Sequence, residues 1–260
     1  MCGRFVSASP PDEIAKYFDA AAPEAALPES YNVAPTNDVY AVYETGGVRR
    51  VDAFHWGFVP HWAKDPSVGN RMINARAETL ATKNAYKPSL RKRRCIIPAD
   101  GFYEWKKVPG QKTKQPMFIH RRDGERLAFA GLWTIWRPKR ADGDDPGEGG
   151  PDEGDELHSC TIITTSANDD VAEVHDRMPV ILGADDWSTW LDEGNDDLDT
   201  LGRLLVPAPP KLIELRPVST EVNNVRNKGS HLIDEVDPGA DAGPVQGTLL
   251  GGDGDTSTKA

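Results

Sequence analysis

The chain has 260 residues, of which 38% are hydrophobic and 27% charged, and its formal net charge at pH 7 is -11. This composition is enough to bury a sizeable core, which excludes a globally disordered chain. No run of about 18 apolar residues occurs, so no transmembrane helix is expected. The sequence turns polar after MCGRF and lacks the apolar stretch of a signal peptide, so we expect a cytoplasmic protein.

Helices are expected in four segments where apolar residues recur at helical spacing or where proline and acids mark a first turn. These segments are 10–18, 74–85, 185–193 and 198–207. Strands are expected where β-branched and aromatic residues are bounded by Gly, Pro or Asp. In chain order these are 39–44, 50–59, 94–105, 116–121, 127–133, 159–165, 178–182 and 213–218. Because strands and helices do not alternate regularly, the pattern predicts an α+β domain with a mixed or antiparallel, partly closed β-sheet core and flanking helices.

Two segments depart from this pattern. Residues 137–156 and 237–260 are rich in glycine, proline and acidic side chains and show no apolar period. We expect the first to be a disordered acidic insertion between two strands and the second to be a disordered acidic tail. Residues 1–236 would then form one domain.

The acidic total conceals a basic segment. Residues 71–126 hold 15 Lys and Arg against 5 Asp and Glu. Because salt screens charges over about 8 Å at physiological ionic strength, a local basic surface attracts phosphate groups despite the distant acidic excess. For the run RKRR at 91–94 taken alone, a solvated loop is the favoured interpretation.

Three cysteines are too few and too widely spaced for a disulfide framework, and no CxxC pair indicates zinc. Cys95 and Cys160 lie among β-branched residues and are expected to be buried on strands. The six histidines do not cluster with cysteines or carboxylates at ligand spacings, so we predict no metal site and no cofactor.

Cys2 follows Met1 directly, and aminopeptidases generally remove methionine when the next side chain is small. The chain would then begin with an amine and a thiol on adjacent carbons, and their ordinary pKa values of about 7.7–8.0 and 8.5 leave both usable near neutral pH. An amine condenses with an aldehyde to an imine, which the thiol closes to a thiazolidine ring. Position alone nevertheless favours an incidental Cys2, or an ordinary amidotransferase-type nucleophile.

The segment NARAE at 74–78 spaces three polar residues at alternating positions. Alternation places Asn74, Arg76 and Glu78 on one side if the backbone is extended there. A plainer interpretation, favoured for the residue taken alone, is that Asn74 caps a helix.

Two further segments set polar residues beside apolar ones. Glu104 lies between Tyr103 and Trp105, where partial desolvation suits a carboxylate to general acid–base work. His175 and Arg177 precede an apolar strand and offer a proton carrier and a phosphate-binding fork. Taken singly, a surface carboxylate and a turn histidine are the favoured interpretations.

The segments YNVAPT (31–36) and HWGFVPHW (55–62) form aromatic and proline-rich turns. Unpaired bases stack on exposed aromatic side chains at about 1–3 kcal/mol each. We expect Trp56 and Phe58 in the core, which leaves Trp62 as the candidate for such a contact.

Together these segments resemble the SRAP (SOS response-associated peptidase) family, whose members are abasic-site processing proteins. The matching segments are MCGRF (1–5), YNVAPT (31–36), FHWGFVPHW (54–62), INARAET (73–79), RCIIPADGFYEWK (94–106), AFAGLW (128–133), TIITTSAN (161–168), VHDRMPVIL (174–182) and PVSTEVNNVRNKG (217–229). The combination of MCGRF, NAR-E, GFYEW and HDRMP is highly specific to the family.

The resemblance implies a covalent reaction with single-stranded DNA that contains abasic sites. Once Met1 is removed, Cys2 would trap the ring-opened C1′ aldehyde as a thiazolidine. Asn74 would position the Cys2 end, Glu104 would move protons, and His175 would assist sugar ring opening and reversal of the link. Peptidase activity toward the first peptide bond and lyase activity at the lesion are implied as well.

The resemblance also implies contacts with the rest of the strand. Arg4, Arg76 and Arg177 would bind the phosphates that flank the lesion. Trp62 and the Pro35 turn are weaker candidates for contacts with bases. We expect a monomer with no membrane association, with replication-fork proteins as further partners.

Two other classes of function remain open. An N-terminal-cysteine amidohydrolase would also need removal of methionine but would not need the basic segment. A non-covalent DNA-binding or adaptor module would need no chemistry, and the presence of all four catalytic candidates counts against it. Retention on single-stranded DNA that weakens with salt would separate the first alternative from the covalent DNA-binding protein.

Overall fold

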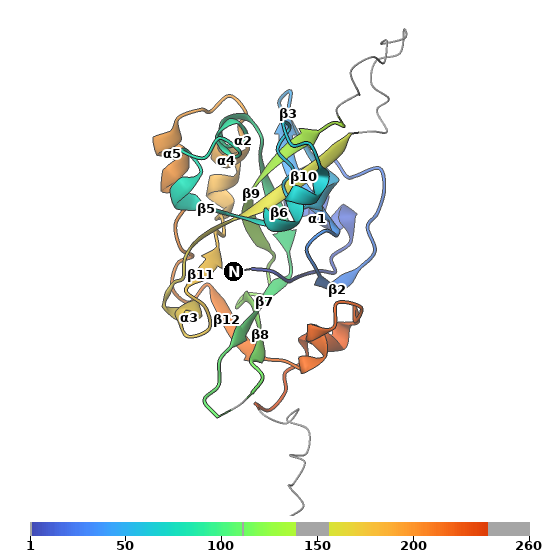
Figure 1. Ribbon diagram of the computed structural model, residues 1–260, viewed down its shortest axis with the longest axis vertical. Coiled ribbons are helices and arrows are strands. Elements are labelled where there is room, and N and C mark those ends of the chain that lie inside the picture. Colours follow the sequence, from blue (N-terminus) through green and yellow to red (C-terminus); the bar gives the residue numbers. More distant parts are fainter. Residues whose placement is uncertain (1, 111, 139–155, 239–260) are drawn as a thin grey trace, which may run out of the picture.

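The computed structural model describes residues 2–110, 112–138 and 156–238 (Figure 1). The predicted acidic insertion and acidic tail lie outside the described residues, apart from a few residues at their boundaries. Within the described part, no helix is both long and apolar enough to cross a membrane.

Seven strands form the larger sheet, in the order β11-β10-β4-β3-β6-β9 with β5 paired to β10. Their bounds are β3 Asp38–Thr45, β4 Val48–Trp56, β5 Asn74–Arg76, β6 Arg94–Ala99, β9 Leu127–Trp136, β10 Leu157–Ser166 and β11 Arg177–Pro179. Because β9 also pairs with β10, the strands β10, β4, β3, β6 and β9 close into a ring. Strand β10 runs parallel to β4 and antiparallel to β9, so the expectation of a mixed, partly closed sheet is confirmed.

Five strands form the second sheet, which is antiparallel and has the order β12-β8-β7-β1-β2. Their bounds are β1 Phe5–Ser7, β2 Ser30–Val33, β7 Gly101–Lys106, β8 Gln115–Arg121 and β12 Ile213–Pro217. In Figure 1 the ring occupies the upper half of the molecule and the second sheet the lower half, with the start of the chain between them.

The expected single strand over 94–105 is wrong, because the chain passes from one sheet to the other at Asp100. Strand β6 before it belongs to the ring and β7 after it to the second sheet. The Asp100 carboxylate accepts hydrogen bonds from the backbone N–H groups of Ala8 and Ser9 at 2.7 and 3.1 Å. This crossing therefore ties the start of the chain to the junction between the sheets.

Helices are short and lie at the periphery. The α-helices are α1 Pro11–Tyr17, α2 Lys87–Lys92, α3 Asp169–Ala172, α4 Trp187–Leu191 and α5 Leu198–Arg203. The 3-10 turns are η1 Pro66–Arg71, η2 Ala77–Thr79, η4 Ala184–Asp186, η5 Thr220–Asn223 and η6 Ser230–Ile233. The helices expected at 10–18, 185–193 and 198–207 are confirmed over shorter spans.

The helix expected at 74–85 is wrong. Residues 74–76 form β5 and pair in parallel with β10, with Asn74 opposite Ile162 and Arg76 opposite Thr164. A sheet partner supplied by a distant part of the chain thus overrides the local helical pattern. The alternative interpretation of an extended backbone with alternating side chains is the one that the structure adopts.

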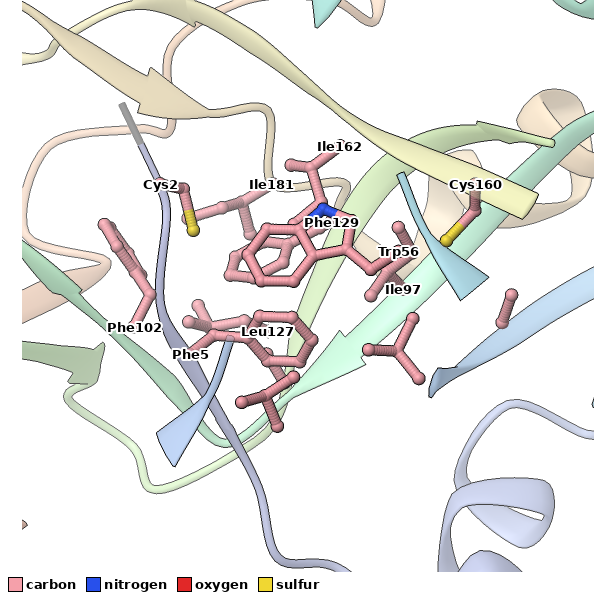
Figure 2. Close-up of a cluster of buried hydrophobic side chains, with 14 of the residues drawn as sticks. Cys2, Phe5, Trp56, Ile97, Phe102, Leu127, Phe129, Cys160, Ile162 and Ile181 are labelled. Carbon is pink, nitrogen blue, oxygen red and sulfur yellow. The ribbon is translucent and has the colours of Figure 1, made fainter. Parts of the chain in front are cut away.

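The core fills the inside of the ring and its junction with the second sheet. Trp56 and Phe58 are 0% and 1% exposed, as expected. Cys95 on β6 and Cys160 on β10 are fully buried, which confirms their assignment as strand cysteines. Figure 2 shows Cys160 at one side of the largest core cluster and Cys2 at the other.

We predict that Gly101→Ala destabilises the fold by about 2–3 kcal/mol through overpacking. A methyl group at Gly101 would lie 2.3 Å from the Phe118 ring and 2.8 Å from the Ile119 carbonyl oxygen. The control is Gly202→Ala in α5, where a methyl group meets nothing within 4 Å. That variant should gain about 0.5–1 kcal/mol. Urea unfolding followed by tryptophan fluorescence measures both, and equal stabilities would contradict the close approach.

We also predict that the free energy of unfolding falls as the pH rises past about 9. Burial raises the pKa of the Cys95 and Cys160 thiols above the ordinary range of about 8.5–9 for a cysteine. A raised pKa in the folded state gives a stabilisation that is complete below the unfolded pKa and lost above it. Each thiol contributes up to about 1.4 kcal/mol per pH unit to this loss. Cys160→Ala should show a shallower fall between pH 8 and 10, and an unchanged slope would contradict the assignment.

Candidate active site

The first residues of the chain are enclosed at the junction of the two sheets. Cys2 is 0% exposed, and its side chain lies beside Ile181 and Phe102 (Figure 2). Burial raises the pKa of the Cys2 thiol, and the nearby Glu104 carboxylate raises it further, whereas a hydrogen bond from the Arg4 backbone N–H lowers it. The thiol is therefore protonated at neutral pH in this arrangement.

Asn74 holds the backbone of Cys2. Its Nδ2 donates a hydrogen bond of 2.8 Å to the Cys2 carbonyl oxygen. Its Oδ1 is buried and has no hydrogen-bond partner among the residues that the structure describes. Strand β5 can present this side chain because β10 extends beyond the ring, pairing first with β4 and β9 and then with β5 and β11.

Glu104 reaches the same place from the second sheet. Strand β1 pairs with β7 so that Phe5 lies opposite Phe102, and the Tyr103 N–H donates to the Arg4 carbonyl oxygen at 2.9 Å. Continuing this register toward the N-terminus brings Glu104 alongside the Cys2 end. Glu104 is only 4% exposed, so the interpretation as a surface residue is wrong.

His175 lies in the turn between α3 and β11 and is partly exposed. Its Nδ1 lies 3.0 Å from the Arg177 backbone nitrogen and 2.8 Å from the Asp176 carboxylate. The two contacts require different protonation states of Nδ1. The Arg177 backbone N–H can donate only to an unprotonated Nδ1, whereas the Asp176 carboxylate can accept only from a protonated one. The Asp176 side chain is 87% exposed and hydrated, so we favour the fixed backbone donor. This leaves the proton on Nε2.

The three candidate arginines differ in what they contact. Arg4 donates to Asn32 Oδ1 at 2.7 Å and to the Val222 carbonyl oxygen at 2.9 Å. Arg76 is exposed at the end of β5. Arg177 forms a bidentate ion pair with Glu78. The structure thus brings Arg76 and Arg177 onto strands that both pair with β10, whereas Arg4 faces the C-terminal segment.

The candidate base contacts lie in turns. Trp62 is 52% exposed, in contrast to the core residues of the same motif. Pro35 begins a turn in which Thr36 has a φ of 73°, within the left-handed region. Both positions are accessible to a ligand.

Sequence inspection missed Asn32, which is fully buried in the motif YNVAPT. Its Nδ2 donates to the carbonyl oxygens of Val222, Asn224 and Asn227, and its Oδ1 accepts from Arg4. It therefore attaches β2 to the C-terminal segment beside Arg4. The sequence feature that could have indicated this role is an asparagine among the apolar residues of a strand.

The run at 91–94 is not simply a solvated loop, because Arg94 is 3% exposed. Its guanidinium donates to four backbone carbonyl oxygens, those of Leu90, Arg91, Trp190 and Asp192. This arginine caps the ends of α2 and α4 and is unavailable to a phosphate. A count of charges along residues 71–126 thus overstates the basic surface.

Among the described residues, no group of three or more His, Cys, Asp or Glu could hold a metal ion. The side chains gathered around Cys2 are instead a thiol, an amide and a carboxylate, with an imidazole and two guanidinium groups on neighbouring elements. Such a set suits proton transfer and anion binding at an electrophilic carbon.

Comparison with known proteins gives consistent matches. A family model described as SOS response associated peptidase (SRAP) matches residues 1–225. The chain is 42% identical over 236 residues to abasic site processing protein YoqW of Bacillus subtilis (strain 168), covering 90% of this chain and 99% of YoqW. It is 33% identical over 244 residues to abasic site processing protein YedK of Escherichia coli (strain K12), covering 91% and 100%.

A solved structure of a protein from Bacteroides thetaiotaomicron has the same fold. The TM-score is 0.77 at 21% sequence identity, and the match covers 90% of this chain and 100% of that chain. At this identity the likeness concerns the fold alone.

We predict that Asn74→Ala loosens the enclosed start of the chain. Loss of the 2.8 Å hydrogen bond should cost about 1 kcal/mol and expose the Cys2 thiol transiently. Alkylation of Cys2 by iodoacetamide, quantified by peptide mass spectrometry in the folded protein, should accelerate several-fold, while Cys95 stays unlabelled. The control is Asn195→Ala, which removes a hydrogen bond to the Thr189 carbonyl oxygen far along the chain. Equal Cys2 labelling in both variants would contradict the role of Asn74.

Proposed function

Because the chain belongs to the SOS response associated peptidase (SRAP) family, we propose that it processes abasic sites in single-stranded DNA by a covalent link at Cys2. The names of YoqW and YedK support the substrate class. The convergence of Cys2, Asn74 and Glu104 at the junction of the sheets is the observation that carries the chemistry. The link is a thiazolidine between the N-terminal residue and the C1′ carbon of the lesion.

The first step frees the α-amine of Cys2. Hydrolysis of the peptide bond between Met1 and Cys2 consumes one water molecule and releases methionine. Whether a separate aminopeptidase or the chain itself performs it, the product is a 1,2-aminothiol. The proposed autopeptidase activity places Glu104 in the role of the base that activates this water.

The second step joins the amine to the lesion. The abasic deoxyribose opens to its C1′ aldehyde, the neutral amine of Cys2 adds to that carbon, and a water molecule leaves to give an imine. His175 assists ring opening by donating a hydrogen bond through Nε2 to the sugar ring oxygen, and the proton of the C1′ hydroxyl moves to that oxygen through solvent. In the chain that still carries Met1, burial keeps the Cys2 thiol protonated, and a neutral thiol is a much weaker nucleophile than a thiolate. This supports attack by the amine first.

The third step closes the ring. The Cys2 sulfur adds to the imine carbon, the thiol proton moves to the nitrogen, and a five-membered thiazolidine results. Glu104, buried beside the thiol, is suited to carry this proton. Asn74 holds the Cys2 carbonyl oxygen during these steps and offers its buried Oδ1 to a donor on the sugar.

The same imine explains a lyase activity. An imine at C1′ acidifies the C2′ protons and permits β-elimination of the 3′ phosphate. Closure by the thiol consumes the imine and prevents this cleavage. The ratio of ring closure to elimination therefore decides whether the strand is protected or cut.

We predict that the protein forms a heat-stable adduct with single-stranded DNA carrying an abasic site. The substrate is a uracil-containing oligonucleotide treated with a uracil glycosylase, and denaturing gels and intact mass measure the adduct. Cys2→Ala should abolish it, since no thiol is left to close the ring. Glu104→Gln should slow it by about 100-fold or more, as loss of a general acid–base group does.

Cys95→Ala serves as the matched control, because it removes an equally buried thiol that lies within the ring. It should form the adduct at the normal yield. A normal heat-stable yield from Cys2→Ala would defeat the assignment. Binding to intact single-stranded DNA that is absent, or insensitive to salt, would favour the amidohydrolase alternative.

A further inference from the structure

The bidentate ion pair between Glu78 and Arg177 lies beside the candidate site. Arg177 donates to Glu78 Oε1 at 2.6 Å and to Oε2 at 3.1 Å, and it also donates to the Thr164 carbonyl oxygen. The pair joins β11 to η2 across the end of β10. Asn74, which holds Cys2, is on the strand that leads directly into η2.

The Glu78 carboxylate fills the position that an anionic ligand would take. Two parallel N–H···O bonds are the geometry in which a guanidinium also binds a phosphate. The Arg177 Nε is buried and has no hydrogen-bond partner among the described residues. A buried donor left unbonded is costly, so the pair does not satisfy all that this guanidinium can bind.

The Glu78 side chain can move away from Arg177 into solvent. Its side chain is 53% exposed, whereas that of Arg177 is 14% exposed. The hydrogen bonds from Arg177 lower the pKa of Glu78, so its carboxylate is charged at neutral pH. An exposed carboxylate regains water when the pair opens, which is why such pairs contribute little stability.

We propose that Glu78 is an affinity- and specificity-determining residue that competes with a DNA phosphate for the Arg177 guanidinium. This inference rests on the proposed function, since it requires a DNA strand that passes Cys2. A phosphate next to the nucleotide held at Cys2 meets β5 and β11, and it must displace Glu78 to reach Arg177.

The competition lowers the affinity for every strand but matters most for undamaged DNA. An intact strand is held only by reversible contacts, so the cost of opening the pair appears fully in its dissociation constant. A strand with an abasic site is captured covalently, and capture removes it from the equilibrium. Glu78 thus widens the difference between lesion and undamaged DNA.

The test compares Glu78→Gln with the wild-type protein by fluorescence anisotropy on an undamaged single-stranded oligonucleotide. Glu78→Gln should bind about threefold to tenfold more tightly at low salt. In this variant Arg177 does not have to release a carboxylate before it binds a DNA phosphate. The plot of log affinity against log salt should steepen by up to about 0.7, the value of one additional phosphate contact on a single strand. Glu78→Asp keeps the charge but shortens the side chain by one methylene group, so its carboxylate reaches Arg177 less well, and it should give a smaller gain.

The matched control is Glu13→Gln. Glu13 pairs with Arg126 at 2.6 Å with similar exposures, 58% for the acid and 19% for the base, and it lies on α1. Its removal changes the net charge equally and should leave DNA affinity nearly unchanged. In an Arg177→Gln background the gain from Glu78→Gln should largely disappear.

Folded variants in which Glu78→Gln binds no more tightly than wild type, or no more tightly than Glu13→Gln, would overturn the inference. Adduct formation on abasic DNA is measured in parallel. A Cys2-dependent adduct without an affinity gain defeats only the role of Glu78. An affinity gain without any adduct defeats the covalent function and leaves the competition standing.

Discussion

The candidate site depends on the enclosure of the first residues between the closed ring and the second sheet. Chain termini are ordinarily poorly ordered unless they are tied down. Here Cys2 is fully buried, its carbonyl oxygen is held by Asn74, and the next residues lead directly into β1. Because β1 pairs with β7, the same pairing that orders the chain start also carries Glu104 to it. An amine and a thiol on a free end would have no fixed partners.

Strand β10 makes this arrangement possible because its two halves pair with different sets of strands. Its first half closes the ring through β4 and β9, and its second half leaves the ring to pair with β5 and β11. Those two short strands bear Asn74, Arg76 and Arg177, and His175 lies just before β11. The closed ring therefore supports these polar groups, which lie on or just before strands outside it. Within the proposed reaction, the apolar ring sets the protonation of the thiol and the short strands supply the polar partners.

The role of each arginine depends on what its side chain contacts in the fold, and not on the net charge of its sequence segment. Arg94 caps helix ends from inside the protein, and Arg126 and Arg177 are each paired with a carboxylate. When a guanidinium is already paired with a carboxylate, binding of a phosphate gains only the difference in free energy between the two ion pairs. Under the proposed function, this acidic chain would hold a DNA strand weakly by charge and capture a lesion firmly by a covalent bond.

Local patterns in the sequence predict the strand-rich α+β character, the buried cysteines at 95 and 160 and the core position of Trp56, because periodicity and composition report local burial. The sequence also identifies the family, through motifs that stand in a fixed order. Contacts between distant segments, in contrast, divide 94–105 between two sheets, make 74–76 a strand and bury Arg94 and Glu104. The very short β1, the Asn32 contacts and the Glu78–Arg177 pair also came from the structure alone. Each depends on a partner far away in the chain, and local sequence cannot show which distant backbone or side chain will complete its hydrogen bonds.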